Sequence, residues 1–421
     1  MENRGNISEK ILKKAIDGLD AWELEGLNID EFLDSRITEE EAIRGTVSSI
    51  LFSYFRNKAV IDWTITEFAK EVKPKFRRIL SVVLTQTFFQ SGIAPESAVN
   101  VAVDYTSRRF GRGPSGFVNG VMRNILRQEQ AKLKEKIPPE TALNIPRPIL
   151  KRWEKNFGRE KTEFFAGLLK AEAPLTFRAV TELDKAELEK IGAKLLDCSE
   201  WGSGFPFYEC SNSQGLFAGK WLEEGKIYIQ DPATSLVHAL ASPRLESTHK
   251  MLDLCAAPGG KSLMFAGKIA QGNLTASDRS LRRQKLTIQN FRKHKCDASV
   301  LVADALNVPF QENTFDFILL DLPCSNTAVF RRRPDALWAF SEKKLSDLLS
   351  LQGKMLEAAS KLLKKGGFLV YSTCSMEPEE NNEQIAAFLA KNEKFKLIEE
   401  KLLHPSASHD GAYSALIACN A

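Results

Sequence analysis

The sequence predicts a multi-domain chain: an all-α amino-terminal domain, a small α+β domain and a carboxyl-terminal doubly wound α/β domain. Three observations support this prediction. The 421 residues suffice for roughly three domains of about 150 residues each. Apolar residues recur at helical spacing through the first third of the chain. Near the carboxyl end, short apolar runs alternate with helical stretches, as in a parallel sheet covered on both faces.

The composition is that of a globular protein, with 43% hydrophobic and 27% charged residues, which excludes a disordered or collagen-like chain. The net charge of +4 is too small to establish a polyanionic partner by itself. No apolar run approaches the roughly 18 residues that cross a bilayer, and the first residues lack the apolar core of a signal peptide. The seven cysteines are scattered without the spacing of a zinc site, so we expect a cytoplasmic protein with no disulfide framework, no metal and no membrane.

The all-helical domain is expected to span residues 1–136, followed by a linker at 137–148. The linker is rich in proline, which lacks a backbone donor and restricts the residue before it, so a helix should not continue through it. Helical periodicity is clearest in five segments of the domain: 40–55, 58–72, 75–90, 96–110 and 117–133.

The small α+β domain is expected at 149–241 and the α/β domain at 242–421. In the small domain the pattern predicts helices at 149–171 and 184–195 and strands at 175–180, 205–210 and 226–230. In the α/β domain it predicts strands at 251–255, 274–277, 299–303, 315–320 and 367–372. Right-handed crossovers place the carboxyl ends of such strands, and any ligand, along one edge of the sheet.

The first of these strands ends in a turn of small residues, Asp253 to Ser262, with glycines at 259 and 260. Such a turn lets a ligand approach the backbone, and the following helix offers free amide donors. A phosphate-binding P-loop would need glycine where Cys255 stands, although Gly260-Lys261-Ser262 fits the end of that motif. A tight turn without a ligand is the other alternative.

Two further strands end in aspartate, Asp278 and Asp304. A carboxylate at the position of Asp278 commonly accepts hydrogen bonds from ribose hydroxyls, and Asp304 is placed to meet an adenine amino group. Together with the glycine turn they favour a nucleoside site. Because the phosphate signature is missing, a nucleoside cofactor without phosphates, S-adenosylmethionine, is the best candidate.

The last two strands end in cysteine segments, DLPCS at 321–325 and YSTCS at 371–375. A lone core cysteine is usually inert, but two at neighbouring strand ends beside a ligand turn point to catalysis. Ionising a free thiol at pH 7 costs roughly 2 kcal/mol. Pro378 is expected to start a helix whose dipole favours an anion at Cys374, whereas Asp321 disfavours ionisation of Cys324. We therefore expect Cys374 to be the nucleophile.

These motifs, DLCAAPGGK, DLPCS and YSTCS in this order, resemble the RsmB-type branch of the NOP/Sun RNA cytosine-C5 methyltransferases. The resemblance covers nearly the whole chain. The segments EEAIRGTVSSIL and GFVNGVMRNILR are similar to the NusB-like RNA-binding domain of that branch, and QDPATSLV at 230–237 resembles the lead-in to its catalytic domain. The resemblance to this family implies a Rossmann-like class I methyltransferase fold for the carboxyl-terminal domain.

The resemblance also implies roles for the matching residues. Cys374 would add to C6 of the target cytosine, Cys324 would assist product release, and Asp321 would lie between cofactor and base. The base would have to leave its stack to reach such a pocket. The residues expected to bind S-adenosylmethionine are Cys255, Ala256, Ala257, Pro258, Gly259, Gly260, Lys261, Asp278, Arg283, Asp304 and Asp321.

Two positions depart from the family pattern. Asn326 stands where the family usually has glycine or alanine, and Ala412 replaces an expected aromatic residue in the closing strand, with no lysine after it.

Of five basic clusters, the arginine triplet 331–333 is the one expected to grip phosphates beside the flipped base, since it follows Cys324 closely. The other basic clusters are Lys73/Lys75/Arg77/Arg78, Arg108/Arg109/Arg112, Arg123/Arg127 and Arg279/Arg282/Arg283. We expect His294, His404 and His409 at the surface.

The resemblance thus implies a monomeric enzyme that makes 5-methylcytosine in small-subunit (16S) ribosomal RNA. A transfer-RNA cytosine methyltransferase of the same family is the nearest alternative. A non-catalytic RNA-binding factor of the antitermination type, with a vestigial cofactor fold, is the rival from another class. A DNA cytosine methyltransferase is a third, but that type uses the proline-cysteine of the fourth strand as its nucleophile.

Overall fold

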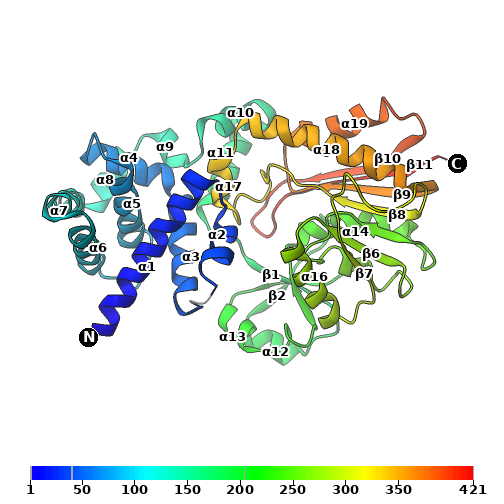
Figure 1. Ribbon diagram of the computed structural model, residues 1–421, viewed down its shortest axis with the longest axis horizontal. Helices are drawn as coiled ribbons and strands as arrows, with labels where there is room; N and C mark the ends of the chain where they lie inside the picture. The colour runs from blue at the N-terminus through cyan, green and yellow to red at the C-terminus, as the bar shows by residue number, and fades with distance from the viewer. Residues whose placement is uncertain (1, 39–40, 203, 421) are drawn as a thin grey trace. The chain divides into compact units, whose positions relative to one another are not determined.

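The computed structural model describes residues 2–38, 41–202 and 204–420. Its internal contacts divide the chain into two compact units (Figure 1). Unit 1 comprises Met1–Ala171 and Arg333–Ala339, and unit 2 comprises Glu172–Arg332 and Phe340–Ala421. Residues 149–171, which the sequence analysis assigned to the small domain, therefore cluster with the helical unit.

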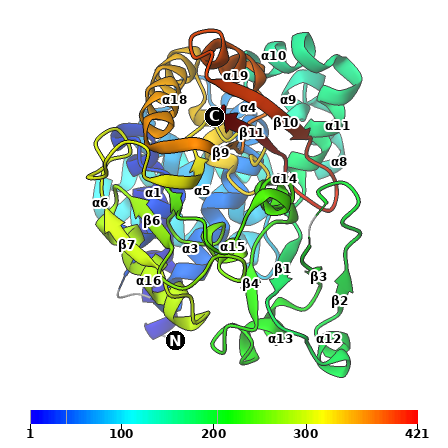
Figure 2. The same cartoon turned by 90° about the vertical axis from the view of Figure 1, so that its right-hand side faces the viewer.

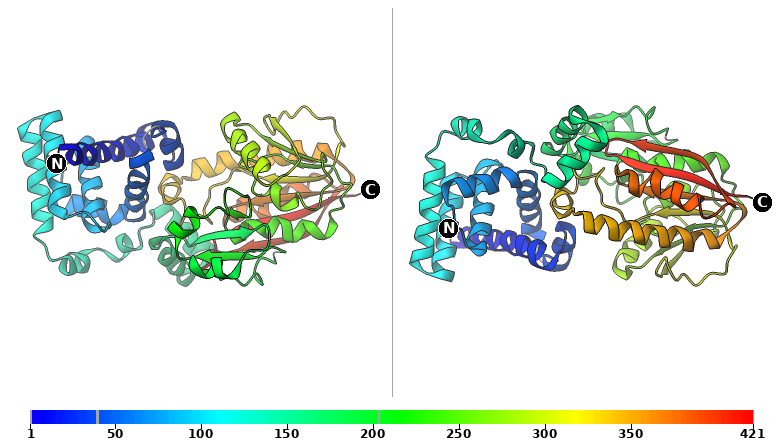
Figure 3. Two further views of the ribbon diagram at one scale, coloured as in Figure 1. Left: turned by 90° about the horizontal axis from the view of Figure 1, so that it is seen from below. Right: turned by 90° about the horizontal axis from the view of Figure 1, so that it is seen from above.

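Unit 1 is helical, as predicted, and Figure 3 shows it from two sides. Its core includes Val82, Val83 and Leu84, which are fully buried. Helices α5 and α6 each begin with a proline, at the position where its missing N–H leaves no hydrogen bond unmade. The described helices are α1 (Glu2–Asp20), the π-helical turn Ala21–Glu25, α2 (Ile29–Arg36), α3 (Glu41–Arg56), α4 (Lys58–Phe68), α5 (Pro74–Phe88), α6 (Pro95–Phe110), α7 (Arg112–Leu126), α8 (Gln130–Lys136), α9 (Pro139–Leu143), α10 (Arg147–Phe157), α11 (Arg159–Lys170) and α17 (Pro334–Ala339).

Two predictions for the end of unit 1 were wrong in detail. The proline-rich stretch 137–148 contains the short helix α9 and the start of α10, both with proline in the first helical turn. The single helix predicted at 149–171 is two helices, because Gly158 adopts φ 82° between α10 and α11. A glycine in this conformation ends the first helix at little cost and lets the second begin at once.

Helix α17 belongs to unit 1 although it follows strand β8 of unit 2 in the sequence. Its Asp335 Oδ2 accepts a hydrogen bond from the backbone N of Ile29 at 3.1 Å, where α2 begins. Its Trp338 Nε1 donates to the carbonyl O of Phe55 at 2.9 Å, and Lys58 Nζ lies 5.1 Å from the centroid of the Trp338 ring. These contacts make α17 an integral part of the helical unit.

The amino-terminal part of unit 2 contains a small antiparallel sheet with strand order β2-β3-β1-β4 among the described residues. Phe177 and Trp221 lie in the core on one of its faces. The predicted strands at 175–180, 205–210 and 226–230 are confirmed, but the helix predicted at 184–195 ends early and is followed by a strand. The elements are β1 (Leu175–Ala179), α12 (Lys185–Lys190), β2 (Ala193–Leu195), β3 (Phe207–Cys210), α13 (Ser213–Ala218) and β4 (Ile227–Ile229).

The rest of unit 2 is built on a mixed sheet, seven-stranded within the described ranges, in the order β10-β11-β9-β8-β5-β6-β7 (Figure 2). All five predicted strands are present and parallel, whereas β11 and β10 are added antiparallel at the β9 edge. The strands are β5 (Met251–Asp253), β6 (Leu274–Asp278), β7 (Ser299–Val302), β8 (Phe315–Asp321), β9 (Leu363–Thr373), β10 (Phe395–Leu403) and β11 (Ala412–Cys419).

Helices cover both faces of this sheet, which explains why β8, in its middle, is apolar on both faces. In β8, Ile318 and Leu320 pack in one core cluster with residues of α18 and α19, and Phe317 and Leu319 pack in another with residues of α14 and α15. The helices and 3-10 turns are Pro232–Ser235, α14 (Leu236–Ala241), Ser242–Arg244, α15 (Ser262–Phe265), α16 (Leu281–Lys293), α18 (Glu342–Leu362), Pro378–Glu380 and α19 (Asn382–Leu389).

Candidate active site

The carboxyl ends of the parallel strands bring the predicted site residues to one edge of the sheet. Strand β8 lies between β5 and β9, with Asp321 opposite Ser372 in the register. The glycine turn follows β5, Cys324 follows β8 by three residues, and Cys374 follows β9 directly. Residues far apart in the sequence therefore meet here because their strands are neighbours.

Backbone conformation and close packing require the two glycines of the turn, Gly259 and Gly260. Gly259 has φ 96°, a conformation that favours glycine. A Cβ on Gly260 would lie 2.8 Å from a ring carbon of Tyr228, so only glycine allows this approach. Burial, reinforced by the charge of Asp253, raises the pKa of the Cys255 thiol, so Cys255 is not ionised near neutral pH. The turn is thus tightly fixed against its surroundings.

Asp278 and Arg283 are both connected to this turn. Asp278 is 3% exposed, and its two carboxylate oxygens accept hydrogen bonds from the backbone N of Ala257 (3.3 Å) and of Ser280 (2.9 Å). Arg283 Nη1 lies 3.4 Å from Asp278 Oδ2, and its Nη2 donates to the carbonyl O of Ala257. Asp304 is exposed beyond β7, where its Oδ1 accepts from the backbone N of Leu306 at 3.0 Å.

Lys261 and Asp321 form an ion pair at the centre of the edge. Lys261 Nζ donates to Asp321 Oδ1 and lies 3.4 Å from Ser372 Oγ. Burial alone would lower the pKa of Lys261, but the charge of Asp321 and its hydrogen bond outweigh this, so that the pKa is raised. Burial raises the pKa of nearby Asp253 to about 7, although Ser262 Oγ donates to its Oδ2 at 2.5 Å.

The two cysteines meet beside this ion pair. Their Sγ atoms are 3.1 Å apart. Cys324 is only 7% exposed, whereas Cys374 is less deeply buried. The hydrogen bond to Cys374, burial and the charges of Cys374 and Glu380 raise the pKa of Cys324 well above its usual value. The more accessible sulfur is therefore that of Cys374.

Asn326 joins the two cysteine segments and was not predicted as a site residue. Its Oδ1 accepts a hydrogen bond from Cys374 Sγ at 3.2 Å, and its Nδ2 donates to the carbonyl O of Cys324 at 3.0 Å. The backbone of Asn326 has φ 62°, which asparagine tolerates better than most residues. The position where the family usually has glycine or alanine therefore keeps a glycine-like backbone and adds a polar contact to Cys374.

Glu380 is a second residue that the sequence analysis missed. It is fully buried, and its Oε1 accepts from the backbone N of Ser325 and from Gln352 Nε2, both at 2.9 Å. The hydroxyl of Tyr371 donates to its carbonyl O at 2.6 Å. Glu380 thus holds the segment after Cys324 against β9. In the sequence it stands in an acidic run, MEPEE, where nothing distinguishes it from a solvated carboxylate.

Cys374 does not lie at the amino terminus of a helix, contrary to the prediction. Pro378–Glu380 form a 3-10 turn, and Asn381 interrupts the chain with φ −115° and ψ −113°. Helix α19 begins only at Asn382, so Cys374 does not lie at its amino terminus. The charges that raise the pKa of Cys324 are those of Cys374 and Glu380, and Asp321 is not among them. What distinguishes Cys374 is its greater accessibility and its contact with Asn326.

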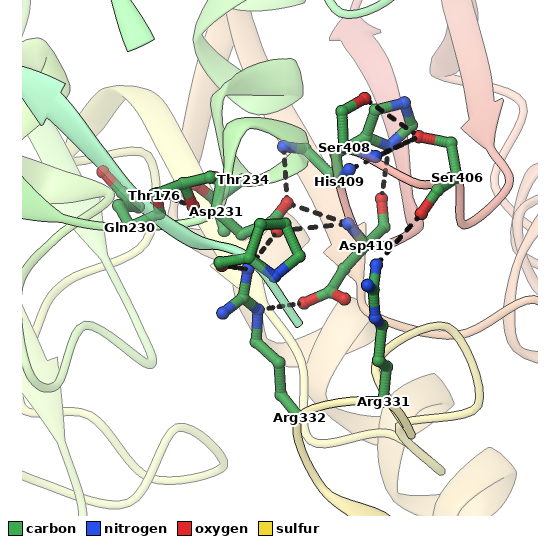
Figure 4. A network of polar contacts seen from close by, with 12 residues as sticks. Thr176, Gln230, Asp231, Thr234, Arg331, Arg332, Ser406, Ser408, His409 and Asp410 are labelled. Carbon is green, nitrogen blue, oxygen red and sulfur yellow. Dashed lines mark hydrogen bonds and ion pairs between the residues drawn. The ribbon is translucent and has the colours of Figure 1, made fainter. Parts of the chain in front are cut away.

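Two arginines of the triplet that was expected to grip phosphate have partners within the protein. In Figure 4, Arg332 lies between two carboxylates: its Nε donates to Asp410 Oδ2 at 2.6 Å and its Nη2 to Asp231 Oδ2 at 2.8 Å. Arg331 donates to the carbonyl O of Ala407 at 3.0 Å. Burial, with the charge of Asp231, raises the pKa of Asp410 to about 7. These two arginines fasten the segment after Cys324 to the rest of unit 2.

Arg333, the third arginine of the triplet, belongs to unit 1, where it lies 3.5 Å from Asp30. In the basic clusters of unit 1, Arg78 pairs with Asp20 at 2.5 Å, and Arg108 pairs with Glu9. Carboxylates therefore already neutralise several of the charges that the sequence offered for RNA.

The expectation that three histidines lie at the surface was wrong for His409. It is 1% exposed, with Nδ1 2.7 Å from the carbonyl O of Asp410 and Nε2 2.8 Å from Glu200 Oε2. His294 and His404 are partly buried. Burial lowers the pKa of His294 to about 4.

Ala412, the other departure from the family pattern, is buried in a cluster with Trp201 and Leu403. An aromatic side chain at 412 would compete with Trp201 for this space.

Among the described residues, no group of histidine, cysteine and carboxylate side chains is placed to hold a metal ion. The helices in the described part of the chain are also too short or too polar to cross a membrane.

Comparisons with known proteins cover both units. Residues 239–417 match the family model described as 16S rRNA methyltransferase RsmB/F, and residues 9–127 match the NusB family. The probable ribosomal RNA small subunit methyltransferase B of Bacillus subtilis (strain 168) is 28% identical over 369 residues, covering 84% of this chain and 81% of the relative. Ribosomal RNA small subunit methyltransferase B of Citrobacter koseri is 28% identical over 371 residues, covering 85% and 84%. The crystal structure of PH0851 has a TM-score of 0.76 at 22% identity and covers 98% of both chains, which shows a common fold.

Proposed function

Because the chain belongs to the RsmB/F methyltransferase family, we propose that it transfers a methyl group from S-adenosylmethionine to C5 of a cytosine in small-subunit ribosomal RNA. The observation that carries this proposal is the pair of cysteine sulfurs 3.1 Å apart, beside the ion pair of Lys261 and Asp321. An enzyme that methylated a more nucleophilic atom would have no use for a thiol at this place. We further propose that it acts as a cytoplasmic monomer, with the NusB-like helices contributing RNA contacts.

The residues at the sheet edge fit S-adenosylmethionine. Asp278 and Asp304 offer carboxylate acceptors for hydroxyl and amino groups, and the chain lacks the full glycine pattern of a phosphate-binding loop. The turn 255–261, Asp278, Arg283, Asp304 and Asp321 would hold the cofactor. When bound, S-adenosylmethionine supplies a methyl group on a positively charged sulfur, which is a strong electrophile.

Cytosine C5 is too weakly nucleophilic to take a methyl group unaided, and Cys374 would remedy this. Its thiolate adds to C6, so that a sulfur–carbon bond forms and the electron pair of the C5–C6 double bond becomes available at C5. C5 would then take the methyl group, whose bond to the sulfonium sulfur would break and leave that sulfur as a neutral thioether. Asp321, which accepts a hydrogen bond from Lys261, would accept another from the N3/N4 edge of the base and stabilise charge there.

Product release requires a base, and Cys324 would serve. Removal of the C5 proton restores the C5–C6 double bond and expels Cys374 as a thiolate. The sulfur of Cys324 lies within proton-transfer distance of Cys374. Because its pKa is raised, Cys324 carries a proton near neutral pH and would have to release it to solvent before its thiolate accepts the proton from C5. The two cysteines thus divide the work of bond formation and bond cleavage.

An assay with labelled S-adenosylmethionine tests the substrate. We expect the protein to label small-subunit ribosomal RNA and the label to appear in 5-methylcytosine after digestion. Labelling of transfer RNA in preference to ribosomal RNA would instead support the transfer-RNA enzyme. Cofactor binding without transfer to either RNA would support the non-catalytic RNA-binding factor and contradict the proposal.

A further inference from the structure

A buried arginine far along the chain from the cysteines has no role in the proposed reaction. Arg178 lies on β1 and is 2% exposed. Its Nε donates to Gln230 Oε1 at 3.3 Å, but its Nη2 is buried and has no hydrogen-bond partner among the residues that the structure describes. A charged group is buried at a high cost unless a partner compensates it, so this guanidinium needs an explanation.

The surroundings of Arg178 compensate its charge only in part. The guanidinium carbon lies 4.7 Å from the centroid of the Phe205 ring and 6.0 Å from that of Tyr228. Burial and Tyr228 are the influences on its pKa, and no carboxylate of the described ranges is among them. Burial lowers the pKa of Arg178 to about 10, so it remains charged at neutral pH. An aromatic face attracts a cation, but it leaves the N–H donors of the guanidinium unused.

Arg178 lines a cavity of about 260 Å³ between the small sheet and the α/β part of unit 2. The far walls are the end of the segment after α15, the start of β6 at Leu274, and the turn of His294, Lys295 and Asp297. These elements precede β6 and β7, so the cavity lies at the amino-terminal edge of the parallel strands. The cofactor turn 255–261, Asp321 and both cysteines follow their strands, and none of them lines the cavity. The cavity is therefore a different site.

We propose that this cavity binds a small oxyanion of the phosphate class, with Arg178 as its principal ligand and Lys295 as a second cation. A guanidinium presents parallel N–H donors that match two oxygens of a phosphate, and Arg178 brings such a group to the wall of this cavity. The volume lies just below the about 300–1,000 Å³ of sites for drug-sized ligands, so the ligand is small. Asp297 on the same wall limits how much negative charge the cavity accepts.

The ligand is a free ion or small phosphate ester rather than the backbone of RNA. Arg178 is too deeply buried for a phosphodiester that carries a ribose on both sides. The walls come from both the small sheet and the α/β part, so a bound oxyanion bridges them. Binding should therefore raise the melting temperature of unit 2. This inference does not depend on the proposed methyl transfer.

Titration of the full-length protein with inorganic phosphate tests the proposal, with chloride at matched ionic strength as the reference. We expect saturable binding by calorimetry and a rise in melting temperature that chloride does not produce. In Arg178→Gln, phosphate binding should weaken at least tenfold, and in Lys295→Gln more modestly. Arg159→Gln, which removes an exposed arginine of unit 1, should bind as the wild type does.

Three outcomes would overturn the proposal: no saturable phosphate binding by the wild type, equal binding by Arg178→Gln, or displacement of phosphate by a single-stranded RNA oligonucleotide. The first and third use only the wild-type protein, so they decide the matter even if Arg178→Gln does not fold. Circular dichroism and binding of S-adenosylmethionine establish whether that variant keeps its structure.

Discussion

Asn326 Oδ1 accepts a hydrogen bond from Cys374 Sγ at 3.2 Å, while its Nδ2 holds the carbonyl of Cys324 at 3.0 Å. One side chain thus connects the segments that carry the two sulfurs. The sulfur of Cys374 is the donor in this contact, so the hydrogen bond must break before the sulfur can attack a carbon atom. Asn326 should therefore moderate the reactivity of Cys374.

Replacement of Asn326 by glycine should make Cys374 more reactive. Glycine keeps the φ of 62° without strain, so the main change is loss of the acceptor. A hydrogen bond contributes about 0.5–1.5 kcal/mol, which corresponds to a roughly 2- to 10-fold faster alkylation by iodoacetamide at pH 7. Asn313→Gly is the matched control, since Asn313 is exposed with φ 54°. Slower alkylation of Asn326→Gly would mean that the amide supports the thiolate instead.

The two cysteines should give opposite phenotypes on RNA. Cys374→Ala removes the proposed nucleophile and should abolish both methylation and any covalent RNA complex. Cys324→Ala keeps the nucleophile but removes the neighbouring sulfur at 3.1 Å, so an RNA adduct should accumulate. Denaturing gel electrophoresis with labelled RNA detects the adduct as a slow band. Exchanged phenotypes would reverse our assignment, and methylation by the double variant would refute thiol catalysis altogether.

Arg332→Ala should destabilise the protein rather than weaken its grip on RNA. Asp231 and Asp410, its two partners, have side chains 8% and 5% exposed and would lose their counter-ion. Breaking a buried ion pair costs about 3–5 kcal/mol, and roughly 2–4 is expected because Arg332 is one-third exposed. Urea unfolding measures the loss. Arg333→Ala should cost roughly 1 kcal/mol or less, and equal losses would contradict the difference in burial.

Asp253 should make stability fall as the pH rises toward 7. Its pKa is 3.8 when exposed and about 7 when buried, so between these values the folded protein binds a proton that the unfolded chain releases. The contribution is present in full at low pH and is lost as the pH passes 7. Relative to Asp253→Asn, the wild type should therefore lose free energy of unfolding from pH 5 to pH 8. A difference between the two that stays constant over this range would show that Asp253 does not titrate there.

The five parallel strands of unit 2 could be predicted from short apolar runs, clearest in β8, whereas β2 and β10 were missed because they are short or rich in charged residues. Ile318 faces one layer of helices and Phe317 the other, and such a run is rare outside a covered parallel sheet. The placement of Asp321, Cys324 and Cys374 at one edge followed from this topology. Breaks in helices were harder to predict. Asn381 separates a 3-10 turn from α19 in a stretch whose composition suits one continuous helix.

Contacts between distant residues could not be predicted from the sequence. Three adjacent arginines suggested a phosphate site, but Arg332 pairs with Asp231 and Asp410, which lie 101 and 78 residues away. In the sequence Glu380 resembles a surface carboxylate, but in the structure it accepts a hydrogen bond from Ser325, which lies 55 residues away. Charge patterns in a sequence do not show which partner each charge meets, and the fold decides this.

Helix α17 has a consequence for how the polypeptide can be divided. The helical unit is completed by Arg333–Ala339, a short stretch embedded between β8 and α18. A fragment ending at residue 171 would lack Trp338, whose indole donates to the carbonyl O of Phe55 at the end of α3. In the complementary fragment Leu337, which is now 2% exposed, would be exposed to water. No single cut yields two self-sufficient pieces. Recombination could exchange the amino-terminal helical unit only if the segment Arg333–Ala339 were exchanged with it.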